Sequence, residues 1–175
     1  MNRVNNILKN ELFRVCLEKI KNYEQERIFC KHDICHFIDV CRIAENLWLE
    51  ARIQMLEENA NASNRIMRNK NTKELIYAAG LLHDIGRWQE YENGTPHEIA
   101  SSHIAPSILQ QCGFDQEEIE TINLAILNHR NKEIMNENNL SGWMYLADKK
   151  SRACFACESE ALCNWSKEKK NLKLM

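Results

Sequence analysis

The chain has 175 residues, enough for one domain with a hydrophobic core, and its formal net charge of −2 gives no basic field that would favour a nucleic-acid polymer as partner. Only two prolines and five glycines occur, and Leu, Ile, Ala, Glu, Lys and Asn are abundant, so the composition favours an all-helical protein. No stretch has the length and apolar character of a membrane span or a signal peptide, and we therefore expect a cytoplasmic protein without a membrane partner.

The first half of the chain predicts two helices. The first covers residues 4–21, with an apolar stripe made of Leu8, Leu12, Val15, Cys16 and Ile20. The second runs from about Asp33, a plausible N-cap, to Glu58. Residues 59–71 are rich in Asn and Ser and lack an apolar period, which predicts a polar loop or a solvated helix end.

A third helix is expected to begin at Asn71 or Thr72 and to end near Gly86, followed by a loop over residues 88–96. A fourth helix covers residues 97–111, where Pro106 could introduce a kink.

The last third of the chain predicts two further helices and an irregular tail. Asp115 and Glu118 form a capping signature for a fifth helix that reaches His129. Residues 130–140 read as a polar loop, and a sixth helix starts near Ser141 and carries Asp148. The segment from Cys154 onward has no helical period.

Helical phase predicts which histidines face the core. His36, His83, His97 and His129 lie on the apolar stripes of four different helices, whereas His103 is in phase with polar residues and is expected to face water. The apolar partners on these stripes are Val40, Ile43 and Leu47 for His36, Ala79 for His83, Ile104 and Ile108 for His97, and Ile126 for His129.

A shared metal ion explains these buried polar residues better than separate structural roles. A single inward histidine is usually a core residue with its own hydrogen-bond partner. Here His83 is followed directly by Asp84, and burying both without a partner would be costly. Helical bundles commonly build metal sites from side chains on facing helices, and a cation would satisfy all of these groups together.

The ordered set His36, His83-Asp84 and Asp148 resembles the HD-domain superfamily of metal-dependent phosphohydrolases. The flanking segments His32–His36, Ala78–Arg87 and Leu146–Lys149 are similar to the three motifs of that superfamily, and the resemblance covers roughly residues 30–152. A His-Asp pair alone is weak support, but the ordered set on predicted helices is strong.

The resemblance implies an all-α, single-domain helical bundle of five or more helices around a metal. It implies His36, His83, Asp84 and Asp148 as ligands of a first metal ion. Some branches hold a second ion, for which His97 and His129 would be ligands, with Asp84 bridging. The alternative is that these two histidines bind substrate phosphate or orient water. Residues 1–29 would be an N-terminal helix packed on the HD domain (30–152), and residues 153–175 a cysteine-containing tail.

The implied activity is hydrolysis, by metal-activated water, of a phosphate ester in a nucleotide or another small phosphorylated metabolite. Asp84, Arg87 and Lys149 are the candidate catalytic residues, and Arg87 and Arg130 are candidates for substrate binding. The mixed nitrogen and oxygen ligands suit one or two ions of Mn, Fe, Co, Ni or Zn.

Three other functions remain open on the sequence. The protein could be a phosphodiesterase or pyrophosphohydrolase of a signalling nucleotide. It could be a metal- or nucleotide-binding module without turnover, or a helical adaptor that binds no metal. The sequence also leaves the oligomeric state open, so an oligomer is possible.

A second group of ligand-type residues lies in the tail, where Cys154, Cys157 and Cys163 follow a Cys-x-x-Cys pattern with one later cysteine. This spacing suits a structural zinc ion or an iron–sulfur cluster, with Cys30 or Cys35 completing the set. The alternative, that these are apolar thiols in a loosely packed terminus, is slightly favoured because only three cysteines are local.

Overall fold

The computed structural model describes residues 1–58 and 71–173, and all regular structure in these ranges is helical, which confirms the predicted fold class. Most of the predicted loop at 59–71 lies outside the described residues. The α-helices are α1 (Asn2–Lys9), α2 (Glu11–Tyr23), α3 (Ile34–Glu58), α4 (Thr72–Leu82), α5 (Arg87–Asn93), α6 (His97–Gln111), α7 (Gln116–Asn128) and α8 (Leu140–Lys150). Short 3₁₀ turns are η2 (Lys132–Ile134), η3 (Cys154–Ala156) and η4 (Glu160–Leu162).

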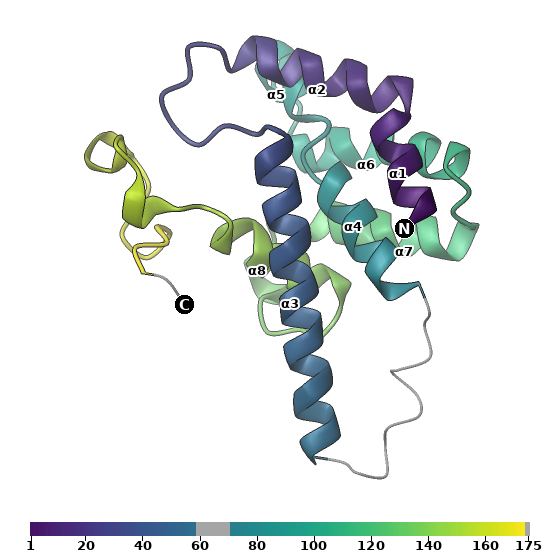
Figure 1. Ribbon diagram of the computed structural model, residues 1–175. Coiled ribbons are helices and arrows are strands. Elements are labelled where there is room, and N and C mark those ends of the chain that lie inside the picture. The colour runs from purple at the N-terminus through teal and green to yellow at the C-terminus, as the bar shows by residue number, and fades with distance from the viewer. Residues whose placement is uncertain (59–70, 174–175) are drawn as a thin grey trace.

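Helix α3 packs against both α4 and α8, and its C-terminal turns extend beyond these two helices (Figure 1). On its core face Phe37, Val40 and Cys41 are fully buried. The approach of α4 is close because Gly80 lacks a side chain: a Cβ there would lie 2.5 Å from Cys41 Sγ. Helix α7 packs against α4, α6 and α8 and so closes the other side of the core.

The N-terminal segment differs from the single helix predicted over residues 4–21. Asn10 has an extended backbone conformation and its side chain accepts a hydrogen bond from Phe13 N, so it ends α1 and caps α2. The break changes the helical phase, and Leu12 and Val15, which we expected on the buried stripe, are 38% and 47% exposed. Cys16 and Ile20 of the predicted stripe are buried, and so are Val4, Ile7 and Phe13.

A second correction concerns residues 83–96. The third helix ends at Leu82, earlier than predicted, and a tight turn over residues 83–86 follows it. The predicted loop at 88–96 is largely helix α5, which ends at Gly94 in the left-handed conformation, with φ of 79°. None of the α5 residues is fully buried, so the sequence carries no apolar period there.

The later elements follow the prediction more closely. Asp115 and Glu118 form the expected capping box at the start of α7, and α8 begins at Leu140, capped by Asn139. Beyond α8 the described residues, up to 173, contain only short turns, and they extend on the side of α3 and α8 away from α1 (Figure 1). None of the helices in the described ranges combines the length and apolar character needed to cross a membrane.

Candidate metal centre

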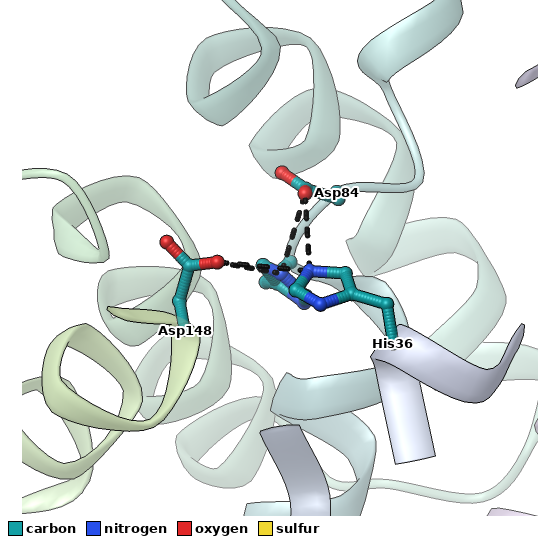
Figure 2. Close-up of side chains that lie close together, drawn as sticks. His36, Asp84 and Asp148 are labelled. Carbon is teal, nitrogen blue, oxygen red and sulfur yellow. Dashed lines mark ion pairs between the residues drawn. The ribbon is translucent and has the colours of Figure 1, made fainter. Parts of the chain in front are cut away.

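The first cluster of ligand atoms lies where α3, the end of α4 and α8 meet. His36 is in the first turn of α3, His83 and Asp84 follow α4, and Asp148 is near the end of α8. One ligand atom from each of the four lies within 4.8 Å of the others. The Nε2 atom of His36 is 3.7 Å from Asp84 Oδ2 and 3.6 Å from Asp148 Oδ1 (Figure 2). Four residues from three separate parts of the sequence therefore surround one point.

A second cluster adjoins the first and shares Asp84 with it. The other carboxylate oxygen, Asp84 Oδ1, is 3.1 Å from His97 Nε2 and 3.5 Å from His129 Nε2. His97 is the first residue of α6 and His129 follows the end of α7. Each oxygen of Asp84 thus faces its own set of imidazoles, as a bridging carboxylate requires.

The donor atoms of this region fit a cation. In the described part of the chain, His36 Nε2, His83 Nε2 and Asp84 Oδ1 are buried without a hydrogen bond, which is costly unless another group satisfies them. The other ring nitrogen of His83 lies 2.8 Å from Gly80 O, and that of His129 lies 2.6 Å from Ile126 O. These contacts direct both Nε2 atoms to the clusters, as backbone carbonyl groups commonly do for histidines that bind metals through the other ring nitrogen.

Burial and neighbouring groups shift the pKa values of several residues in the clusters. Burial would raise the pKa of Asp84, but the neighbouring His83 and His97 hold it well below its usual range. Burial lowers the pKa of His97 to about 4, and it also lowers the pKa of His36. Both imidazoles are therefore neutral at pH 7, the form that binds a metal.

A cavity of about 220 Å³ lies above Asp84 and Asp148. The cationic side chains in its wall are Arg27, Arg87, Arg130, Lys149 and Arg152. Three of them, Arg87, Lys149 and Arg130, were expected at the site from the sequence, and the cavity accordingly favours an anionic ligand.

Each of the three expected cations is paired with a carboxylate of the protein. Arg87 Nη1 is 3.2 Å from Glu90 Oε2, and Arg130 Nη1 is 3.0 Å from Glu98 Oε2. Lys149 Nζ contacts Asp148 Oδ2.

The sequence analysis did not identify three residues near the clusters: Glu24, His32 and Arg152. Arg152 Nη2 donates to Asp148 Oδ1 at 2.9 Å, and its guanidinium lies 4.5 Å from the centre of the Trp165 ring. His32 and Glu24 are 2% and 3% exposed and contact each other beside Asp84. The signal for Arg152 is its spacing of four residues from Asp148, which is one helical turn. His32 and Glu24 lie outside the predicted helices and have no comparable signal.

The profile of the HD domain matches residues 33–162 of the chain. This chain belongs to the HD-domain superfamily. HD-domain proteins are generally metal-dependent hydrolases and bind divalent metals. Here the His and Asp clusters are arranged so that they could hold such ions.

Two relatives of this HD-domain chain differ in how much they share with it. An uncharacterized protein of Clostridium beijerinckii is 42% identical over 174 residues, which cover 99% of each chain. A bifunctional uridylyltransferase/uridylyl-removing enzyme of Cereibacter sphaeroides is 32% identical over 74 residues. That segment covers 42% of this chain and 8% of the enzyme. No solved structure matches the chain.

The cysteines of the tail lie at the edge of the HD domain. Within the described residues, neither group of potential metal ligands contains a cysteine. Cys154 and Cys163 instead line the wall of the cavity, together with Cys30 from the segment before α3, whereas Cys157 is outside the lining. The structure thus does not bring the three tail thiols together as a ligand set, and a metal at the tail stays a prediction.

Proposed function

We propose that this protein is a metal-dependent phosphohydrolase that cleaves a phosphate ester of a nucleotide or another small phosphorylated metabolite. The observation that carries the proposal is the pair of adjoining ligand clusters that share Asp84 at the floor of a cavity with cationic walls. Superfamily membership supports the same reaction class.

His36, His83, Asp84 and Asp148 would hold one divalent ion, and Asp84, His97 and His129 a second. Such an ion supplies water that is activated near neutral pH and a Lewis acid for a phosphoryl oxygen. The protein fixes the ligands before the substrate arrives, because the imidazoles of His83 and His129 are held by backbone carbonyl groups.

The cations of the wall are suited to the charge that develops on a phosphoryl group during transfer. Arg87 has only 17% of its side chain exposed and lies against His97, with 2.7 Å between Nη1 and Nδ1. Lys149 lines the same cavity and lies beside Asp148. We assign stabilisation of the transferred group to Arg87 and Lys149. Arg130 is half exposed and would bind the substrate at the rim.

The size of the cavity favours a small substrate. Its volume of about 220 Å³ is below the roughly 300–1,000 Å³ of pockets that enclose drug-sized ligands. A phosphate with a compact organic group fits such a space, whereas a large signalling nucleotide would extend beyond it. The second candidate is hydrolysis of a phosphodiester, which is favoured by the segment shared with an enzyme whose name describes removal of a uridylyl group.

Hydrolysis of a panel of phosphate esters tests the proposal. Wild-type protein with Mn²⁺ is assayed beside Asp84→Asn, with His103→Gln as a control at an exposed histidine. Release of inorganic phosphate measures hydrolysis of phosphomonoesters and nucleotides, and release of the alcohol or of the nucleoside monophosphate measures hydrolysis of phosphodiesters. We expect kcat/KM to fall by about 10³-fold or more in Asp84→Asn and to stay unchanged in His103→Gln. Equal rates for wild type and Asp84→Asn would contradict the proposal, and so would binding of phosphorylated compounds without turnover. Activity on diesters alone would select the second candidate.

A further inference from the structure

The buried pair formed by His32 and Glu24 lies beside the first ligand cluster. His32 belongs to the segment before α3, and Glu24 follows the end of α2. The His32 ring nitrogen Nδ1 is 2.5 Å from Glu24 Oε1, and the backbone N–H of His32 donates to Glu24 Oε2 at 2.6 Å. Two contacts to one carboxylate fix both the backbone and the ring of His32.

Glu24 is itself held from a second side. The Tyr91 hydroxyl, from α5, donates to Glu24 Oε1 at 2.6 Å, and Arg87 Nε donates to the Tyr91 oxygen at 3.2 Å. Burial alone would raise the pKa of Glu24, but the hydrogen bonds from His32 and Tyr91 lower it to about 2. Glu24 is therefore a carboxylate with a fixed position, and the ring of His32 has a fixed direction.

The second ring nitrogen of His32 is directed to the metal centre without being part of it. His32 Nε2 is 3.7 Å from Asp84 Oδ2, the oxygen that faces the first cluster. Nevertheless His32 belongs to neither group of mutually close ligand atoms among the described residues. It also lines the cavity above the clusters. An oriented imidazole next to a ligand cluster, but outside it, is placed to contact a molecule that occupies the cavity.

His32 differs from the cations of the same wall in what its polar atoms do. Arg87, Arg130 and Lys149 each contact a carboxylate of the protein, so a ligand must compete with these contacts or share them. His32 instead uses one nitrogen for Glu24 and turns the other to the cavity. A ligand that binds His32 causes little loss of side-chain entropy, because Glu24 already immobilises the ring.

We propose that His32, oriented by Glu24, forms a phosphate-binding subsite in which Nε2 hydrogen-bonds an oxygen of the phosphoryl group held at the metal centre. The inference rests on the proposed function, since it names a contact to the substrate of that site. A phosphate oxygen accepts a hydrogen bond from a ring N–H, and a protonated phosphate oxygen donates one to a bare ring nitrogen. The contact therefore does not depend on one protonation state. Glu24 is a positioning residue that acts through His32.

Binding of inorganic phosphate to the Mn²⁺-loaded protein tests the subsite by calorimetry. The variant is His32→Gln, and the matched control is His103→Gln on the exposed face of α6. We expect the phosphate Kd to rise about tenfold in His32→Gln while the Kd for Mn²⁺ stays within about threefold of wild type. An unchanged phosphate Kd, or no phosphate binding by wild type, overturns the proposal. A parallel loss of Mn²⁺ affinity also overturns it, because His32 would then be a metal ligand.

A double-mutant cycle tests the role of Glu24. Glu24→Gln alone should weaken phosphate binding several-fold, and it should have no further effect in the His32→Gln background. Equal effects in the two backgrounds overturn the claim that Glu24 acts through His32. If His32→Gln does not fold, as judged by circular dichroism, Glu24→Gln and Tyr91→Phe carry the test. Both variants should weaken phosphate binding and leave Mn²⁺ binding intact. Unchanged phosphate binding in these variants, or a loss of Mn²⁺ binding, would overturn the proposal.

The failure of this inference can be distinguished from the failure of the proposed function. The calorimetric experiment needs no turnover. Turnover combined with phosphate binding that is independent of His32 overturns the subsite alone. Phosphate binding that depends on His32, in a protein that hydrolyses none of the substrates, supports the subsite and contradicts the hydrolase.

Discussion

Asp84 is 2% exposed, and burial of a carboxylate at such a depth is costly unless polar or cationic groups surround it. His83 and His36 approach one of its oxygens, while His97 and His129 approach the other. Divalent ions held by these residues would offset the negative charge of the carboxylate. Exchange of Asp84 for a neutral residue therefore affects both ligand clusters, whereas exchange of any one histidine affects mainly the cluster to which it belongs.

Glu24 gives a prediction for the dependence of stability on pH. Its pKa of about 2 in the folded protein is below the usual value of about 4.3 for an unfolded chain. The ionised carboxylate therefore stabilises the fold above about pH 4.3, and this contribution is lost as the pH falls toward 2. We expect Glu24→Gln to lower the free energy of unfolding by about 2–3 kcal/mol at pH 7, with a smaller difference at pH 3.

Urea denaturation in the presence of a chelator at both pH values measures this difference. Glu26→Gln serves as the control, because Glu26 is exposed on the same segment and should change the stability little at either pH. A difference between wild type and Glu24→Gln that is equal at pH 7 and pH 3 would contradict the prediction.

Helical phase is sufficient to predict the burial of His83, His97 and His129 and the exposure of His103. It could not identify His32, because that residue precedes α3 and has no helical neighbours to set a phase. Glu24 is a surface residue type at the end of another helix, and only the folded chain brings it to His32. The contact between His32 and Glu24 depends on how two segments pack in the folded chain. The pattern of apolar residues in either segment alone does not predict it.

At the scale of elements, the turn between α4 and α5 positions Asp84 within the clusters and Arg87 beside them. Gly86 makes this turn possible because a Cβ there would lie 2.3 Å from Ser101 N and 2.6 Å from Ala100 C. Its own N–H donates to Ser101 Oγ at 2.9 Å, which ties the turn to α6. Since both obstacles are backbone atoms, a side chain at Gly86 would have to move α6, the helix that carries His97.

Gly86→Ala should therefore lower the free energy of unfolding by about 2–4 kcal/mol in urea denaturation. The comparison is Gly94→Ala, where φ is 79° but no atom lies within 4 Å of the added Cβ. There the conformational strain alone should cost about 1 kcal/mol. An equal loss of unfolding free energy in the two variants would contradict the idea that Gly86 is needed for the close approach of the turn to α6.

The long helices could be predicted because each has an apolar face with a regular period. The short helix α5 has no fully buried residue and so no such period, and the sequence gives only its closing glycine, Gly94. The break at Asn10 was missed because the apolar residues around it can be read as one continuous stripe. The capping role of Asn10 becomes visible only when α1 and α2 pack against different helices, α4 and α5.

At the scale of the whole molecule, the clusters join elements that are otherwise separate. The ligands come from α3, α6, α8 and the segments that follow α4 and α7. An ion that binds only the folded arrangement therefore stabilises the entire bundle, by about 2.7 kcal/mol when its concentration is a hundred times its Kd.

Calorimetric unfolding with Mn²⁺ and with a chelator tests this linkage. Each kcal/mol shifts the Tm of a chain of this length by about 2–4 °C, so one ion at such a concentration should raise the Tm by about 5–10 °C. We expect the largest shift for wild type, a smaller one for His129→Gln, and none for Asp84→Asn. A shift in Asp84→Asn equal to that of wild type would show that the ion binds elsewhere.

The ligands of the first cluster are spread along the chain from His36 to Asp148. During synthesis the residues that carry the other three ligands therefore leave the exit tunnel before Asp148 does. No nascent fragment that ends before Asp148 offers the complete set of donors. The first cluster consequently captures a metal ion only after α8 has been synthesised, and the ions that compete for the site are those present around a chain that already contains α3 to α8.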